Sequence, residues 1–247
     1  MGEFTGAVAL VTGAASGIGR ATALRFAQEG ARLVLADTDA AGGAALAAEL
    51  AAQGFTCVFQ PCDVAAEADH AALMQTALRH FGRIDHAFNN AGITSLEDDW
   101  DSARMRHLLA VNLHGVLFGM QAQIAHMRAS GGGTIVNTGS IAGLSAAGTV
   151  DYCASKHGVV GLTRSAGVRY AKEGVRINAV CPGVIDTPMT QALLTNAAIR
   201  PLLAQMVPLG RFGRPEEVAE AVLFLSSARS AFIVGHALPV DGGYMAR

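Results

Sequence analysis

The sequence predicts an α/β domain built on a doubly wound, seven-stranded, mostly parallel sheet flanked by helices. Short apolar runs alternate with longer stretches of helical periodicity along the whole 247-residue chain. The first apolar run leads through a glycine-rich turn into a helical stretch. Because parallel neighbours need a crossover connection, this alternation indicates a parallel sheet covered by helices.

The expected elements follow one another with no linker or repeat between them, so we predict one domain over residues 1–247. Strands are expected near 7–12, 31–36, 55–60, 84–88, 133–138, 175–180 and 234–240. Helices are expected near 17–29, 39–53, 66–81, 101–129, 152–173 and 215–226. The long irregular stretch from Pro182 to Arg214 follows a strand, where ligands bind in such sheets, so residues of about 183–214 are expected to form a substrate lid. Trp100 is expected to serve packing.

The composition excludes several classes of function. Hydrophobic residues make up 51% of the chain, which predicts a folded core, and a net charge of −2 gives no sign of a nucleic-acid partner. The four cysteines show no metal-like spacing, so we expect no metal site and interpret them as small buried side chains in a reducing compartment. No signal peptide or membrane span is expected, which leaves the cytoplasm as the predicted location.

The glycine-rich turn predicts a phosphate-binding site. It joins the apolar run at 7–12 to the first helical stretch and contains Gly13, Ser16, Gly17, Ile18 and Gly19. In this context glycines let backbone N–H groups approach a pyrophosphate at the positive end of a helix. The spacing G-x-x-x-G-x-G differs from the general dinucleotide fingerprint, and a tight strand–helix turn is the simpler alternative.

Asp37 predicts which nicotinamide cofactor is bound. It ends the second apolar run, eighteen residues after Gly19. A carboxylate at this position would bind the adenosine ribose hydroxyls and repel a 2′-phosphate. No basic residue stands at positions 14–16 or at Thr38 to receive that phosphate. The sequence therefore favours NAD over NADP, although a turn-forming role would explain Asp37 equally well if it stood alone.

Tyr152 and Lys156 form the candidate catalytic pair. Four residues apart on a helix, they would share one face. A phenol has an ordinary pKa of about 10, and a neighbouring cation favours the phenolate. The hydroxyl of Ser140, twelve residues before the tyrosine, could polarise a carbonyl at the same point.

Together these residues resemble the short-chain dehydrogenase/reductase family, and the resemblance covers essentially the whole chain. The motifs that carry it are Thr12-Gly-x-x-x-Gly-Ile-Gly19, Asp63-Val64, Asn89-Asn-Ala-Gly92, Asn112, Ser140, Tyr152-x-x-x-Lys156, Pro182-Gly183, Thr187 and Asp241-Gly-Gly243. The family implies a Rossmann-type domain. It also implies a homotetramer in which the helices near 101–129 and 152–173 pair between subunits.

The resemblance assigns further roles. Asp63 and Val64 would flank the adenine, and Asn90, Ala91 and Gly92 would shape a strand end against the cofactor ribose. Thr187 would fix the carboxamide, and Pro182 and Gly183 would also bind the cofactor. Lys156 would hold the nicotinamide ribose. Asn112 would anchor a water that leads protons to solvent; a helix-interior side chain bonded to backbone is the alternative.

One departure from the family concerns Ser140. The family pattern places the serine thirteen residues before the tyrosine, so the loop from Ile141 to Asp151 is one residue short. We expect the missing residue near 146–148, where Gly148 permits a tight path, with Ser140 facing Tyr152. Ser145 is the alternative serine.

The expected function is hydride transfer between NAD and a secondary alcohol or ketone. The largely apolar sequence from Met189 to Val207 favours a neutral, hydrophobic or cyclic small molecule over a phosphate or carboxylate. An NADP-linked 3-ketoacyl-thioester reductase and a non-catalytic nicotinamide-binding protein remain alternatives. An epimerase or dehydratase would need a larger substrate domain.

Overall fold

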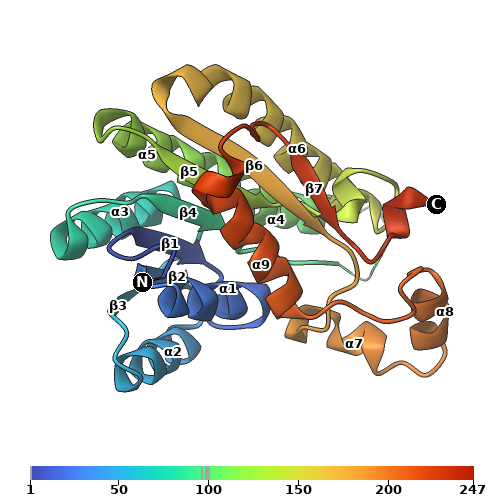
Figure 1. Cartoon of the computed structure of the whole chain (residues 1–247). Helices are drawn as coiled ribbons and strands as arrows, with labels where there is room; N and C mark the ends of the chain where they lie inside the picture. The colour runs from blue at the N-terminus through green and yellow to red at the C-terminus, as the bar shows by residue number, and fades with distance from the viewer. Residues whose placement is uncertain (1, 96, 98–100) are drawn as a thin grey trace.

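The seven-stranded sheet is fully parallel and organises the chain (Figure 1). The computed structural model describes residues 2–95, 97 and 101–247, so Trp100 lies outside the described residues. The strands are β1 (Val8–Thr12), β2 (Arg32–Asp37), β3 (Cys57–Pro61), β4 (His86–Asn89), β5 (Gly133–Thr138), β6 (Val175–Pro182) and β7 (Ala237–Val240). They lie in the order β3-β2-β1-β4-β5-β6-β7, which confirms the predicted doubly wound fold.

Helices cover both faces of this sheet. The long ones are α1 (Gly17–Gln28), α2 (Ala40–Ala52), α3 (Glu67–Phe81), α4 (Ser102–Leu109), α5 (Gly115–Ala129), α6 (Val150–Tyr170) and α9 (Pro215–Ser226). Helices α1, α2 and α9 lie on one face, and α3, α5 and α6 lie on the other (Figure 1).

Alternation along the central strands produces two cores. Ala9 and Val11 of β1 belong to the core that includes Phe26 of α1. Val8 and Leu10 belong to the core on the opposite face. Because successive side chains of a strand point to opposite faces, a strand buried on both sides is apolar throughout. This explains why the sequence of β1 reads as a continuous apolar run.

The predicted helix at 101–129 is interrupted by a π-helical turn. The turn, Ala110–His114, joins α4 to α5. The stretch Ser102–Ala129 is apolar and long enough to cross a bilayer by length and composition alone. Its side chains Leu108, Met120 and Met127 are nevertheless buried in the domain, so we interpret it as a core helix.

Two expectations need correction. The stretch after β6 is not irregular throughout, because it contains a 3₁₀ turn (Pro188–Thr190) and the short helices α7 (Gln191–Leu194) and α8 (Ile199–Gln205). Apolar side chains in this stretch, such as Leu194, find buried positions, which lets short helices form there. The cysteines are not all buried: Cys57 and Cys153 are partly exposed, and none of the four is assigned to a disulfide.

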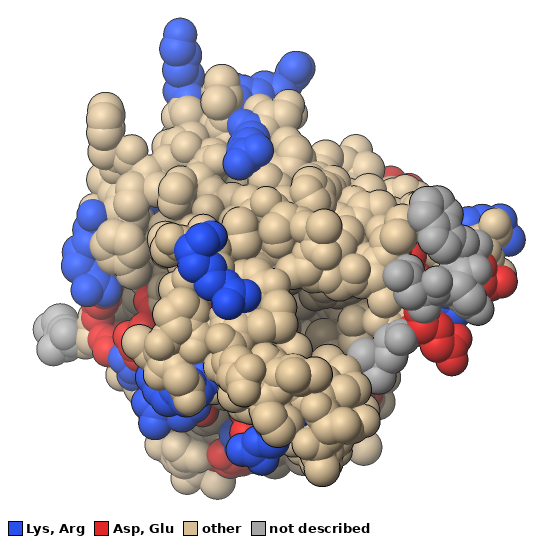
Figure 2. Space-filling model, turned by 90° about the vertical axis from the view of Figure 1, so that its right-hand side faces the viewer, with Lys and Arg blue, Asp and Glu red and all other residues tan. Residues whose placement is uncertain are grey.

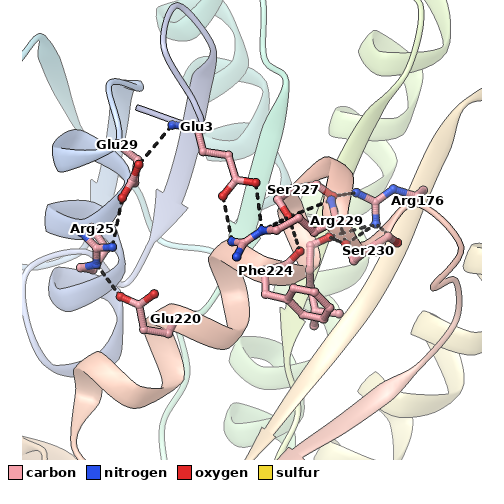
Figure 3. A network of polar contacts seen from close by, with 10 residues as sticks. Glu3, Arg25, Glu29, Arg176, Glu220, Phe224, Ser227, Arg229 and Ser230 are labelled. Atoms are coloured by element: carbon pink, nitrogen blue, oxygen red, sulfur yellow. Dashed lines mark hydrogen bonds and ion pairs between the residues drawn. The ribbon is translucent and has the colours of Figure 1, made fainter. Parts of the chain in front are cut away.

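A polar network connects the C-terminal parts of α1 and α9 and includes Arg176 of β6 (Figure 3). Arg176 of β6 donates four hydrogen bonds, at 2.8–3.0 Å, to oxygens of Leu225 in the last turn of α9 and of Ser227 and Ser230 after it. Carbonyls at a helix C-terminus lack intrahelical partners and carry partial negative charge. The guanidinium therefore caps α9 and ties it to the sheet.

Candidate active site

The site lies where the parallel strands end. The carboxyl ends of β1, β4, β5 and β6 meet at one edge of the sheet. The strand order reverses between β1 and β4, because β2 and β3 follow β1 on one side and β4 to β7 lie on the other. Ligands bind at such switch points in open α/β sheets. A cavity of about 450 Å³ occupies this edge. Figure 2 looks onto this end and shows a hollow bordered largely by residues without charge.

The glycines of the first turn leave room for a backbone-bound ligand. Gly13 and Gly17 have φ of +65° and +51°, which glycine adopts readily. A Cβ on Gly13 would lie 2.8 Å from the Asn90 amide nitrogen, and one on Gly19 would lie 1.9 Å from the Gly13 carbonyl oxygen. Gly13 and Gly17 line the cavity with Ser16 and Ile18, whereas Gly19 packs behind them. This cradle at the N-terminus of α1 fits a pyrophosphate.

Asp37 lies at the rim of the same cavity. Its carboxylate accepts hydrogen bonds from the backbone N–H groups of Ala15, at 2.9 Å, and Asp39, at 3.0 Å. These bonds hold the carboxylate beside the glycine turn. Lys156 is the only lysine or arginine among the described residues that line the cavity.

The other predicted cofactor residues are also brought to the cavity wall. They are Asp63, Val64, Asn90, Ala91, Gly92, Pro182, Gly183 and Thr187. Thr187 reaches across the glycine turn, because a Cβ on Gly17 would lie 3.3 Å from its methyl carbon. Residues from six separate places in the sequence thus surround one space.

Thr12 was not predicted as a site residue, although it organises this wall. Its hydroxyl accepts hydrogen bonds from the backbone N–H groups of Asn90, at 3.0 Å, and Ala91, at 3.1 Å. The Asn90 side chain donates to the Thr12 carbonyl at 3.1 Å. These bonds join the ends of β1 and β4. The position of a threonine at the end of a buried strand, just before the glycines, was the available signal.

Tyr152, Lys156 and Ser140 converge at the inner end of the cavity. Tyr152 and Lys156 project from the first turns of α6, and Ser140 follows β5. The Lys156 ammonium lies 5.6 Å from the centre of the tyrosine ring and donates to the Thr138 carbonyl at 2.8 Å. Thr138 is a second residue that the sequence reasoning missed.

Burial controls the protonation of this pair. It raises the pKa of Tyr152 to about 12, against a smaller lowering by the hydrogen bond with Ser140. It also lowers the pKa of Lys156 to about 8. The expected lowering of the tyrosine pKa by the lysine is therefore not present in the protein alone, because removal of both groups from water favours the neutral forms. The two groups are close enough to titrate as a pair.

The two serines are clearly distinguished by position. Ser140 lines the cavity beside Tyr152, and its hydroxyl accepts a hydrogen bond from the Ala142 N–H at 3.1 Å. Ser145 instead donates to the Ile141 carbonyl at 2.9 Å. Gly148, with φ of +143°, closes the short loop with a hydrogen bond to the Ala146 carbonyl. The tight turn lies in the predicted place.

Asn112 lies in the π-helical turn and is fully buried. Its side chain accepts from the Ile93 N–H at 2.8 Å and donates to the Ile93 carbonyl at 2.9 Å and to Ser155 at 3.2 Å. It therefore holds the backbone that leaves β4, which agrees with the backbone-bonding alternative. A π turn commonly marks a functional position in a helix.

A second hollow of about 400 Å³ adjoins Ser140 and Tyr152. One side is formed by Thr94 and Ser95, and the lid side by Met189 and Leu193. The described residues that line this hollow include no charged side chain. Its position beside the phenol makes it the candidate substrate pocket.

Three comparisons agree with this geometry. A family model described as Enoyl-(Acyl carrier protein) reductase matches residues 13–245. The chain is 45% identical to cis-4-hydroxycyclohexanecarboxylate dehydrogenase of Sinomonas cyclohexanicum, over the full length of both. It is 38% identical to cyclohexanol dehydrogenase of Acinetobacter sp. strain SE19, covering 99% of this chain and 97% of the relative.

A solved structure gives the same result. The crystal structure of levodione reductase superposes with a TM-score of 0.92 at 38% identity and covers 98% of this chain and 99% of the other. Similarity at this level covers the glycine turn, Tyr152, Lys156 and residues 183–214 together. The chain therefore belongs to the short-chain dehydrogenase/reductase family, whose members are oxidoreductases that bind a nicotinamide cofactor and act on CH–OH groups.

Proposed function

We propose that the protein is an NAD-dependent dehydrogenase that interconverts a neutral cyclic secondary alcohol and its ketone. The observation that carries this proposal is the position of the Tyr152 phenol. It lies where a cavity with a glycine cradle meets a pocket without charged side chains. When bound, the nicotinamide supplies the hydride acceptor or donor, and the protein supplies orientation and proton transfer.

The choice of NAD rests on Asp37. Its carboxylate is held at the cavity rim by two backbone N–H groups, so it cannot easily turn away from a ligand. A 2′-phosphate placed there would meet a like charge, whereas ribose hydroxyls can donate to the carboxylate. The same argument disfavours the NADP-linked 3-ketoacyl-thioester reductase.

The proposed proton transfer uses groups of this chain. In oxidation the deprotonated Tyr152–Lys156 pair takes the hydroxyl proton of the alcohol at the phenol oxygen. In reduction the phenol returns that proton. Ser140 holds the substrate oxygen, and Asn112 keeps the strand end in place; its water-anchoring role is part of the proposal. The intact tyrosine and lysine disfavour a non-catalytic binding protein.

The substrate class rests on the pocket and on the relatives. The pocket offers hydroxyl groups and apolar side chains, which suit a neutral ring that carries an oxygen substituent. The names of two relatives refer to cyclohexane alcohols, and one of those substrates also carries a carboxylate. The absence of a cation among the described pocket residues favours the neutral alcohol.

We also propose a homotetramer in the cytoplasm. Val168 of α6 is 76% exposed, and Phe232, between α9 and β7, is fully exposed. Both side chains are available for contact with another subunit. Pairing of the α4–α5 and α6 helices between subunits would follow the family. Four cysteines that are not assigned to a disulfide suit a reducing compartment.

A panel of alcohols assayed with both cofactors tests the function. The panel contains cyclohexanol, a hydroxycyclohexanecarboxylate, a linear secondary alcohol and a sugar alcohol, each with NAD and with NADP. We expect the highest kcat/KM for cyclohexanol with NAD. A higher kcat/KM for the carboxylate or with NADP would contradict the corresponding part of the proposal.

A further inference from the structure

Arg104 of α4 lines neither hollow, yet it contacts two residues that are close in the chain to residues of the substrate pocket. Its Nη1 donates to Glu97 at 2.9 Å, and its Nε lies 3.4 Å from the carboxylate of Asp151. Glu97 follows Thr94 and Ser95 closely in the chain, and those two residues form one wall of the pocket. Asp151 directly precedes Tyr152 in α6.

The Asp151 end of this contact is largely enclosed. The side chain of Asp151 is 10% exposed, and its second oxygen accepts the Tyr152 N–H at 2.8 Å. The side chain of Arg104 is 22% exposed. An ion pair with this degree of enclosure is screened less by solvent and salt than one at the surface. The carboxylate thus links the guanidinium to the backbone of the tyrosine.

Ile93, Glu97 and Asp101 are each hydrogen-bonded to a residue of α4 or of the π-helical turn that follows it. Asn112 holds Ile93 at the start of the segment, as described above. At the other end, Asp101 caps α4 by accepting the Arg104 N–H at 2.6 Å. Between these two positions in the chain, Arg104 donates to the carboxylate of Glu97. Helix α4 is itself anchored in the core by Leu108, which is 1% exposed.

We propose that Arg104 is a positioning residue for the substrate, which holds the wall formed by Thr94 and Ser95 at its working distance from Tyr152. The inference rests on the proposed function of the same pocket. Arg104 does not line either hollow, so it acts through Glu97 and Asp151 rather than by touching substrate. Loss of the contact widens the pocket without altering the glycine cradle or Lys156.

The test compares Arg104→Met with Arg106→Met. Arg106 is exposed on the same helix and takes no part in the ion pairs described for this segment. We expect Arg104→Met to raise the KM for the alcohol about five- to tenfold, with a smaller change in kcat and an unchanged Kd for NAD measured by fluorescence. Arg106→Met should behave as wild type. Arg104→Lys, which keeps the charge, should raise the KM for the alcohol less than Arg104→Met does.

A second measurement does not depend on turnover. Amide hydrogen exchange at residues 93–95 and 97 should be faster in Arg104→Met than in wild type and unchanged in Arg106→Met. Adding Glu97→Gln to Arg104→Met should change neither KM nor exchange further, because the shared contact is already lost. Unchanged exchange in Arg104→Met, or a KM equal to that of Arg106→Met, would overturn the inference. Failure of the wild-type enzyme to oxidise any cyclic alcohol would count against the proposed function, while the exchange result would still decide the role of Arg104.

Discussion

Two cationic side chains of the protein, Lys156 at the candidate active site and Arg176 at the C-terminal end of α9, differ in how many hydrogen bonds they make. Arg176 makes four hydrogen bonds to oxygens of one segment. The ammonium of Lys156 has three donors and makes one described hydrogen bond, to Thr138. Arg176 is half-buried, whereas Lys156 is 3% exposed.

The number of hydrogen-bond partners of a buried cation helps to tell a structural position from a functional one. A cation whose donors are satisfied by the protein stabilises the fold and has little left for a ligand. A buried cation with few partners destabilises its charged form, and burial accordingly lowers the pKa of Lys156 to about 8. Such a group persists because a ligand or a reaction uses it, which is the signature of a functional site.

The largest effect is expected at the tyrosine beside Lys156. Tyr152→Phe removes only the oxygen that transfers the proton, so kcat should fall about 10²- to 10⁴-fold while the Kd for NAD stays within about twofold. Steady-state kinetics and cofactor titration measure both. Tyr170→Phe, on the same helix, is the control. A Tyr152→Phe enzyme with a tenth of wild-type activity would show that the phenol does not carry the proton.

A comparable effect is expected for the hydroxyl that faces the phenol. Ser140→Ala removes the group that holds the developing charge on the substrate oxygen, and kcat should fall about 10²- to 10³-fold. Ser145→Ala removes a hydroxyl bonded to the Ile141 carbonyl and should leave kcat unchanged. The reverse outcome would assign the role to Ser145.

Substituting Lys156 should mainly lower activity, whereas substituting Arg176 should mainly lower stability. Lys156→Met should lower kcat/KM about 100-fold and weaken cofactor binding, without reducing the free energy of unfolding. Arg176→Met should leave kcat/KM of the folded enzyme unchanged and lower the free energy of unfolding by about 2 kcal/mol, because buried carbonyls lose their donors. Denaturant unfolding measures the second quantity, with the exposed Arg169→Met as control. A stability loss in Lys156→Met as large as that in Arg176→Met would remove the distinction.

A smaller effect is expected at the cofactor rim. Asp37→Ala should raise the kcat/KM with NADP relative to NAD about 10- to 100-fold, because the like charge facing a 2′-phosphate is gone. Asp39→Ala is the matched control, since it removes a nearby carboxylate that caps α2. It should lower stability slightly and leave the preference unchanged. Wild-type enzyme that already prefers NADP would contradict the assignment of Asp37.

The smallest effect concerns pH. Burial lowers the pKa of Lys156 to about 8, so the lysine is the member of the pair that loses its proton first as the pH rises. Only the deprotonated pair can accept a proton, so alcohol oxidation should increase about tenfold between pH 7 and 9, and ketone reduction should decrease over the same range. Initial rates with a solvent isotope effect, which shows that chemistry limits the rate, provide the measurement. A flat profile under those conditions would be inconsistent with the pair acting as base.

Much of the fold could be predicted from sequence because its signals are local. All seven expected strands occur within a few residues of their predicted bounds, since apolar runs between glycine-rich turns mark a buried parallel sheet. The glycine turn and the Tyr-x-x-x-Lys spacing are local signals too, and the structure places both at one cavity; their roles stay predictions. The two ends of the 215–226 helix, begun by Pro215, were correct to the residue.

The remaining features depend on contacts between distant segments. Thr12 and Thr138 act through backbone groups that belong to other strands, and no local pattern announces such partners. The pKa of Tyr152 was expected to fall, but the degree of burial, which only the folded chain reveals, raises it. Of the short helices after β6, α7 buries Leu194, a position that only the assembled fold reveals, whereas α8 buries no residue.

The π-helical turn at 110–114 makes this part of the chain intolerant of length changes. A π turn contains one more residue than the α-helical turn it replaces. Deleting one residue there would convert it into an ordinary α-helical turn, while the flanking helices keep their relative rotation. The wide turn from which Asn112 bonds to the backbone of Ile93 would then be lost. A single-codon deletion in this turn should therefore be far more damaging than any conservative substitution within it.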